Sequence, residues 1–215
     1  MCKTDITREK LSKLIIQKKS RLCFSADLDD KNKLIHILQN IGDKIVICKI
    51  HYDFYDDKDQ ELKNKLIELS LEKDFLLMED RKFVDISYTV QKQYHKYSKW
   101  IDLITVMGNV HSDVISNLSG VVLIANMSNN KYDYLETTKQ LSLEHSNRIV
   151  GVVTQYYIDF NGLINMTPGI NNDKTSINDQ NYRKIEDVKT DIVIVGRGIY
   201  NSEDYVNSAE RYRLK

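Results

Sequence analysis

Short runs of apolar residues alternate with longer amphipathic stretches along almost the whole chain. Eight runs rich in valine, isoleucine and leucine lie at residues 21–27, 44–51, 75–78, 102–106, 120–126, 148–153, 163–166 and 191–195. Continuous apolar runs of this length are typical of strands that are buried on both faces of a parallel sheet. The pattern therefore predicts eight parallel strands.

The stretches outside these runs place apolar residues three and four positions apart, which predicts helices. The expected helices, the first of which precedes the first strand, lie at residues 7–18, 31–41, 59–73, 84–100, 114–118, 132–145 and 202–212. Ser202 is expected to cap the last helix, because a serine hydroxyl can accept a hydrogen bond from a free N–H group of the first turn.

An eightfold alternation of strands and helices favours a (β/α)₈ barrel, with residues 1–215 forming a single domain at the short end of the length range for that fold. The alternative is a doubly wound open sheet, but no G-x-G-x-x-G motif follows the first strand. Polar residues also collect where the expected strands end, and these are Asp27, Lys49, His51, Asp80, Lys82, Ser128 and Arg197. In a barrel, these ends converge on one mouth, where active sites lie.

The composition excludes several classes of protein. The chain has 31 basic and 31 acidic residues, so no basic excess favours nucleic acid as a partner. No apolar run approaches the ~20 residues that span a membrane, and the N-terminus lacks the apolar core of a signal peptide. Cys2, Cys23 and Cys48 show no C-x-x-C spacing, which favours reduced cysteines over a zinc site. We therefore expect a cytoplasmic protein.

Two carboxylates bracket a lysine at the end of the third expected strand. Side chains two positions apart on a strand share a face, so Asp80 and Lys82 are expected to point the same way. Asp85 follows where the chain can turn back toward the mouth. Two like charges ~4 Å apart repel by about 1 kcal/mol in water and about 4 kcal/mol at an effective dielectric constant of 20, unless a cation lies between them. The pattern indicates either a solvated charge cluster or a lysine held by acids for chemistry.

The loops after the last two strands contain Thr167-Pro168-Gly169 and Gly196-Arg197-Gly198. In barrels, the loops after the seventh and eighth strands often bind phosphate. Glycine allows the backbone to approach a ligand, and an arginine can bind phosphate through two parallel hydrogen bonds. Gln180 and Tyr182 could add donors from the preceding polar loop. The alternative is a pair of ordinary turns with a surface arginine, because the motif is not a P-loop.

Together, these motifs resemble the orotidine 5′-phosphate decarboxylases, especially the eukaryotic-type branch, over nearly the whole chain. The matching segments are Ser25-Ala26-Asp27, residues 49–53 (K-I-H-Y-D), residues 79–86 (E-D-R-K-F-V-D-I), Met127-Ser128, residues 167–170 (T-P-G-I), Gln180-Asn181-Tyr182 and residues 194–199 (I-V-G-R-G-I). The resemblance implies loss of CO₂ from C6 of orotidine 5′-phosphate to give UMP, the last step of de novo pyrimidine biosynthesis. It also implies that no metal or organic cofactor is used. Nothing resembles the orotate phosphoribosyltransferase to which this domain is fused in many eukaryotes.

The resemblance assigns roles to the matching residues. Lys82 would stabilise the developing C6 carbanion and protonate it, and Asp80 would lie against the departing carboxylate. Lys49 and Asp27 would complete an alternating chain of charges and bind the ribose hydroxyls. Further substrate-binding residues would be Ser25 and Gly196 within their motifs, Ser128 for the pyrimidine amide, Pro168 for the pocket wall, and Gln180, Tyr182 and Arg197 for the phosphate. Asp85, Ile86 and Thr89 would enter the neighbouring subunit's site, so that the active enzyme is a homodimer.

The sequence departs from the family pattern without losing a charged residue of the central cluster. The departures are Ser87-Tyr88 in place of Gly-Asn, Thr105-Val106-Met107 in place of Asn-Ala-His, and Asn126 in place of an acid. His51 is expected to support the site or a subunit contact rather than act as a base.

Two alternatives remain open. The first is a magnesium-dependent sugar-phosphate lyase of the same superfamily, such as hexulose-phosphate synthase or ketogulonate-phosphate decarboxylase, which shares D-x-K-x-x-D. The second is a non-catalytic nucleotide-binding homologue. The S-A-D, K-x-H and Q-N-Y segments favour the orotidine branch over the lyases.

Overall fold

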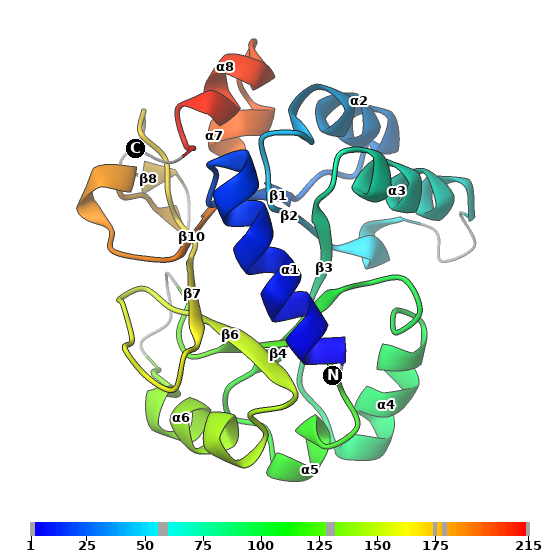
Figure 1. The fold of residues 1–215 in the computed structure, drawn as a ribbon, viewed down its shortest axis with the longest axis vertical. Coiled ribbons are helices and arrows are strands. Elements are labelled where there is room, and N and C mark those ends of the chain that lie inside the picture. Colours follow the sequence, from blue (N-terminus) through cyan, green and yellow to red (C-terminus); the bar gives the residue numbers. More distant parts are fainter. Residues whose placement is uncertain (1–2, 56–59, 128–131, 174–175, 178–179, 214–215) are drawn as a thin grey trace.

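The computed structural model describes residues 3–55, 60–127, 132–173, 176–177 and 180–213, with the backbone alone for residues 176, 177 and 180. Eight parallel strands close into a barrel in the order β1-β10-β7-β6-β5-β4-β3-β2 (Figure 1). The strands are β1 (Leu22–Ala26), β2 (Ile47–Ile50), β3 (Leu76–Phe83), β4 (Leu103–Met107), β5 (Val121–Ile124), β6 (Ile149–Val153), β7 (Ile164–Thr167) and β10 (Ile192–Val195). Each coincides with one of the eight predicted runs, so the expected barrel is confirmed.

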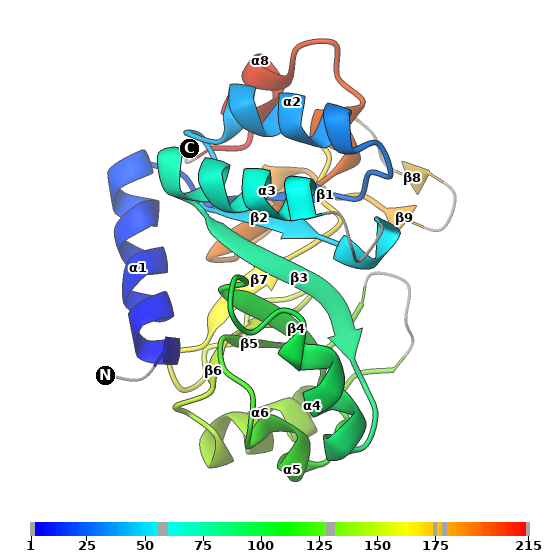
Figure 2. The same ribbon diagram turned by 90° about the vertical axis from the view of Figure 1, so that its right-hand side faces the viewer.

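Helices surround the barrel and cover one of its ends. They are α1 (Lys3–Lys18), α2 (Lys31–Ile41), α3 (Gln60–Glu72), α4 (Ser87–His95), α5 (Ser112–Ile115), α6 (Leu135–Glu144), α7 (Arg197–Tyr200) and α8 (Tyr205–Glu210), with short 3-10 turns η1 (Tyr52–Phe54) and η2 (Ile185–Asp187). Figure 2 shows α1 across the end of the barrel opposite the arrowheads of the strands. Within the described residues, no helix is both long enough and apolar enough to cross a membrane.

The core has two layers because every strand is covered on both faces. Inside the barrel, residues such as Met78, Val122 and Met166 form one buried cluster, and Leu11 and Leu14 of α1 close it from below. A larger cluster fills the space between the strands and the surrounding helices. Burying an aliphatic side chain of this size contributes about 1.5–3 kcal/mol, so the two clusters explain why the valine- and isoleucine-rich runs became strands. The predicted buried, unpaired state of Cys23 and Cys48 is confirmed.

Several predicted boundaries were wrong. The third strand continues through Asp80 and Lys82 to Phe83, as expected, but the helix predicted at residues 84–100 is restricted to α4. Asp204, rather than Ser202, caps the last helix, because its carboxylate accepts the N–H of Asn207. The polar loop before β10 contains an unpredicted antiparallel pair, β8 (Ser176–Ile177) and β9 (Gln180–Asn181).

Candidate active site

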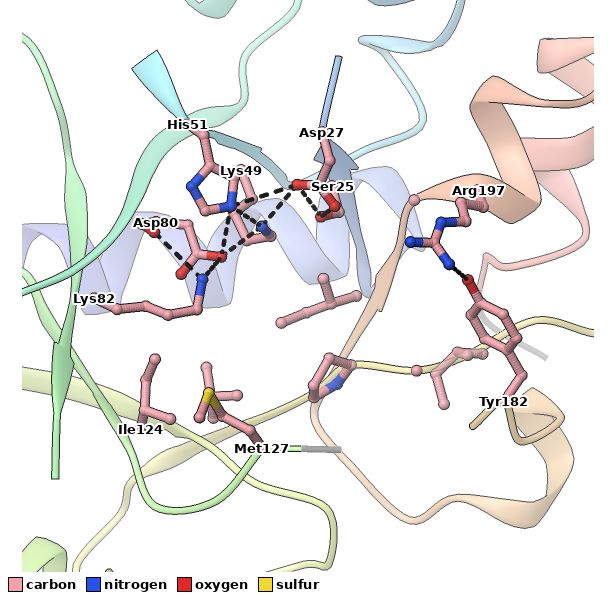
Figure 3. A pocket seen from close by; sticks show the side chains of 16 residues that line it. Ser25, Asp27, Lys49, His51, Asp80, Lys82, Ile124, Met127, Tyr182 and Arg197 are labelled. Atoms are coloured by element: carbon pink, nitrogen blue, oxygen red, sulfur yellow. Dashed lines mark hydrogen bonds and ion pairs between the residues drawn. The ribbon is translucent and has the colours of Figure 1, made fainter. Parts of the chain in front are cut away.

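A cavity of about 280 Å³ opens at the mouth formed by the carboxyl ends of the strands (Figure 3). Its polar lining comes from the ends of β1, β2 and β3 on one side and from the loops around β7 and β10 on the other. The lining residues are Ser25, Asp27, Lys49, His51, Asp80, Lys82, Ile124, Met127, Val153, Pro168, Gly169, Ile170, Tyr182, Ile194, Gly196 and Arg197. The closed barrel thus brings together residues from near the two ends of the chain, from Ser25 to Arg197.

Alternating charges form one wall of this cavity. The Lys49 ammonium lies between two carboxylates, 2.6 Å from Asp80 Oδ2 and 3.1 Å from Asp27 Oδ1. The Lys82 ammonium lies 2.8 Å from the same Asp80 oxygen. Ser25 Oγ donates to the Asp27 carboxylate at 3.0 Å. Every charge therefore has an opposite charge beside it, which offsets the cost of removing these groups from water.

A bulge in β3 positions Lys82. The register against β4 shifts between Glu79 and Phe83, and Lys82 has a φ of +53°. A left-handed backbone costs a non-glycine residue about 1–2 kcal/mol, so surrounding contacts must maintain it. The displaced Lys82 N–H donates to Thr105 Oγ1 at 2.9 Å instead of joining the ladder. The strand reaches the mouth with Asp80 and Lys82 on the same side, as alternation predicted.

Thr105 on β4 holds the two charged residues of β3 together. Its buried hydroxyl accepts the Lys82 N–H and donates to Asp80 Oδ1, both at 2.9 Å. Asp80 Oδ1 is thus satisfied by this hydroxyl, whereas Oδ2 receives both ammonium groups. Thr105 was not among the site residues predicted from the sequence. The signals that could have found it were its polarity within a buried strand and its departure from the usual Asn-Ala-His.

The charges of the cluster shift the pKa of each buried member in the direction that favours its ionised form. Burial by itself would raise the pKa of Asp80, but the charge of Lys49, a hydrogen bond from His51 and the charge of Lys82 hold it well below its usual range. Burial likewise opposes ionisation of Asp27, and Lys49 outweighs it, so that pKa is also lowered. Burial would lower the pKa of Lys49, but Asp80 and Asp27 raise it. Asp27, Lys49 and Asp80 are therefore ionised at neutral pH.

His51 contacts the cluster from the end of β2. Its Nε2 lies 3.3 Å from Asp80 Oδ2 and 3.6 Å from Asp27 Oδ1. The ring stacks on Phe54, with centroids 5.0 Å apart and planes at 13°. The expectation that His51 supports the charged residues agrees with these contacts.

The opposite wall of the cavity contains an arginine beside a tyrosine hydroxyl. Arg197 Nη1 donates to Tyr182 Oη at 3.3 Å, and Figure 3 shows this pair across the cavity from Lys82. Gly169 has a φ of +75°, which favours glycine. A Cβ at Gly196 would lie 3.1 Å from the Ser25 carbonyl, so glycine also lets this turn pack against β1. Pro168, Gly169, Gly196, Tyr182 and Arg197 line the cavity as a separate, singly charged end.

Other predicted site residues do not line this cavity in the described part of the chain. Asp85 and Ile86 are exposed beyond the end of β3, and Thr89 is half-buried on α4. Ser128 lies outside the described residues, as does the side chain of Gln180. The structure therefore brings the predicted central lysines and acids and Arg197 together around one cavity. The assignments of Asp85, Ile86, Thr89, Ser128 and Gln180 stay predictions.

Part of the cavity lining is apolar, which the sequence did not indicate. Ile124, Met127, Val153 and Ile194 contribute to it, and Figure 3 shows Ile124 and Met127 facing the charged wall. Ile124, Val153 and Ile194 belong to predicted strands, but nothing in a continuous apolar run distinguishes a residue at the open mouth from one deeper inside. A flat, partly apolar group with an anion at one end fits such a cavity.

The fold and this mouth define a class: a (β/α)₈ barrel whose active site, built on the ends of its strands, combines an ion-paired lysine with a separate anion-binding end. A family model described as the orotidine 5′-phosphate decarboxylase / HUMPS family matches residues 20–212. The chain belongs to this family.

Curated relatives agree with this assignment, and a solved structure shares the fold. The chain is 31% identical over 240 residues to orotidine 5′-phosphate decarboxylase of Pichia kudriavzevii, covering 98% of the chain and 91% of the relative. It is 31% identical to uridine 5′-monophosphate synthase of Bos taurus over 226 residues, which cover 95% of the chain and 47% of the relative. The chain thus spans about half the length of the synthases that it matches. An orotidine 5′-monophosphate decarboxylase from Methanocaldococcus jannaschii, complexed with the inhibitor BMP, has the same fold, with a TM-score of 0.70, 20% identity and coverage of 90% of this chain and 97% of that one.

Proposed function

We propose that this chain decarboxylates orotidine 5′-phosphate to UMP. The observation that carries the proposal is the position of Lys82. Its ammonium projects into the cavity and pairs with an aspartate oxygen that Lys49 already holds at 2.6 Å. An ammonium fixed in this way can stabilise negative charge on a bound ring without rearrangement as that charge develops.

The reaction breaks the bond between C6 and its carboxylate. The electron pair stays on C6 and CO₂ leaves. Lys82 Nζ then donates a proton to C6, and the neutral amine regains a proton from solvent. Asp80 faces the departing carboxylate and fixes Lys82, whereas Lys49 and Asp27 bind the ribose hydroxyls. These assignments rest on the resemblance to the family, and the order of charges along the wall, Asp27–Lys49–Asp80–Lys82, supports them.

The phosphate is assigned to the far end of the cavity. Arg197 and the Tyr182 hydroxyl can both donate to phosphate oxygens, and Gln180 and Ser128 are proposed for the phosphate and the pyrimidine amide on the resemblance alone. Because the phosphate is remote from C6, its binding energy can hold the ring against Lys82 rather than merely tighten ground-state binding.

We also propose that the active enzyme is a homodimer in which Asp85, Ile86 and Thr89 serve the neighbouring site. Asp85 is exposed beside an apolar surface that includes Val84, 58% exposed, and Ile86, 69% exposed. Exposed apolar side chains adjoining a mouth are suited to a subunit contact.

The test uses chelator-treated protein and follows the loss of orotidine 5′-phosphate absorbance. We expect turnover without added metal, and a Lys82→Ala variant that binds UMP but does not turn over. Lys13→Ala on α1, at the other end of the barrel, removes the same charge and should keep full activity. Near-normal turnover by Lys82→Ala would end the assignment. Activity that disappears with EDTA and returns with Mg²⁺ would favour the sugar-phosphate lyases, although the position between Asp27 and Asp80 is already filled by Lys49.

A further inference from the structure

A second group of ligand-type side chains lies behind the charged wall of the cavity. His51, Asp53 and Glu79 each offer one nitrogen or oxygen atom, and these atoms lie within 4.8 Å of one another. They come from the end of β2, from η1 and from β3. Because side chains alternate along a strand, Glu79 faces away from the side that carries Asp80. This group is therefore distinct from the Lys49–Asp80 pair, and neither Asp53 nor Glu79 lines the cavity.

Glu79 is the member whose environment points to a ligand. It is 0% exposed, and its Oε2 accepts the Tyr52 N–H at 3.0 Å. Its other oxygen, Oε1, is buried and has no hydrogen-bond partner among the described residues. A buried carboxylate oxygen without a partner is energetically costly, and either a proton or a cation relieves that cost. Burial raises the pKa of Glu79 to about 8, so a metal ion that binds here displaces a proton.

His51 has the orientation of a metal ligand. Its Nε2 lies 3.3 Å from Asp80 Oδ2, and Figure 3 shows its second ring nitrogen pointing away from the lysine–aspartate cluster. Histidines that bind metals usually donate their other ring N–H to a carboxylate, which fixes the tautomer and leaves the ligating nitrogen with its lone pair. Donation from Nε2 to Asp80 would prepare Nδ1 of His51 in this way.

Asp53 supplies the exposed side of the group. Its Oδ2 pairs with Arg81 Nη1 at 2.7 Å, and both side chains are more than a third exposed. Such a surface pair is worth only about 0.2–1 kcal/mol. It can therefore open, or leave Oδ1 of Asp53 to bind, when a more strongly held cation arrives.

We propose that His51 Nδ1, Asp53 and Glu79 form a binding site for a divalent transition-metal ion of the zinc class, with water completing its coordination. One imidazole nitrogen with carboxylate oxygens suits Zn²⁺ or Co²⁺, whereas Mg²⁺ and Ca²⁺ prefer shells made only of oxygen. With metal–ligand bonds of about 2.0–2.2 Å, the ligand atoms of a tetrahedral site lie about 3.4 Å from one another. The three ligand atoms now lie within 4.8 Å of one another, so the side chains must move closer when the ion binds. The ion takes no part in the carbon chemistry; it holds the His51 tautomer that donates to Asp80.

The test titrates Co²⁺ into the full chain without an affinity tag and after treatment with chelator. We expect visible absorption bands that saturate at one ion per chain, are removed by Zn²⁺ and are unaffected by Mg²⁺. Asp53→Asn should weaken Co²⁺ binding at least tenfold, and Glu79→Gln should do the same. Asp53 is exposed and outside the cavity, so Asp53→Asn should fold and keep its metal-free turnover. Asp113→Asn is the matched control, because Asp113 lies 3.4 Å from His111 in an exposed pair on another face.

Two results would overturn the proposal. One is the absence of saturable Co²⁺ bands from folded protein. The other is a Co²⁺ affinity that is unchanged in Asp53→Asn or in a folded Glu79→Gln variant. Neither result bears on decarboxylation, which is measured separately in the absence of metal.

Discussion

Replacing Thr105 by valine would test whether one hydroxyl holds the central charges in place. Valine has nearly the same shape, but it can neither accept the Lys82 N–H nor donate to Asp80 Oδ1, both of which lie 2.9 Å from the threonine oxygen. The substitution therefore leaves a backbone donor and a carboxylate oxygen without their partner in the interior of the protein.

The expected loss of stability follows from these two bonds. A neutral hydrogen bond contributes about 0.5–1.5 kcal/mol and one to a charged group about 1.5–3 kcal/mol, so the free energy of unfolding should fall by about 2–4 kcal/mol. The left-handed backbone of Lys82 would also lose the contact that fixes its N–H. If its ammonium shifts by ~1 Å, turnover can fall by ~100-fold, because a misplaced catalytic group acts poorly even when substrate binds.

Urea unfolding and orotidine 5′-phosphate turnover would be measured for Thr105→Val and Thr105→Ser. Serine keeps the hydroxyl and removes one methyl group, which is worth about 0.8 kcal/mol. We expect serine to retain most turnover and valine to lose kcat with little change in KM. Equal losses of stability and turnover in the two variants would refute the role assigned to the hydroxyl.

Three further predictions concern the two ends of the cavity, the subunit contact and acid stability. Arg197→Ala should raise KM strongly. Tyr182→Phe should raise KM only about fivefold, because it removes one hydrogen-bonding hydroxyl worth ~1 kcal/mol. Equal kinetics in wild type and Arg197→Ala would contradict the assignment of Arg197 to the phosphate. Mixing inactive Lys82→Ala and Asp85→Ala subunits should restore some turnover, because one site of each heterodimer is intact; no recovery despite proven subunit exchange would contradict the shared site. The pKa of Asp80 is lowered by folding, so the contribution of Asp80 to stability is present above about pH 4 and is lost as the pH falls further. The difference in unfolding free energy between wild type and Asp80→Asn should therefore decrease below about pH 4. A difference that stays constant with pH would contradict the lowered pKa.

The barrel could be predicted because its strands are buried on both faces. Every one of the eight apolar runs became a strand, and the polar residues at their ends converged as expected. Asp80 and Lys82 break the apolar pattern, but they were expected on the third strand because side chains two positions apart share a face, and β3 includes both. The helix that follows was predicted from residue 84 and begins only at Ser87.

Side-chain contacts between neighbouring strands could not be predicted from the sequence. Thr105 and Asp80 are 25 positions apart, and only the pairing of β3 with β4 and the bulge beside Lys82 bring the hydroxyl to both groups. The helix boundaries were less certain for a local reason. Ser202 and Asp204 can each serve as a cap, and the choice depends on where the chain leaves α7.

The four central charges differ in exposure, and this difference has a mechanistic consequence. The side chains of Lys49 and Asp80 are 8% and 9% exposed, whereas those of Asp27 and Lys82 at the ends of the chain of charges are 41% and 35% exposed. The inner pair is thus already desolvated and fixed by the fold, which bears most of the cost of burying charge. A substrate that fills the cavity would exclude water from the outer two. Their interactions with a bound substrate would strengthen as the local dielectric constant falls. The fold therefore holds Lys49 and Asp80 rigid, and substrate binding provides the final increase in the electrostatic field around Lys82.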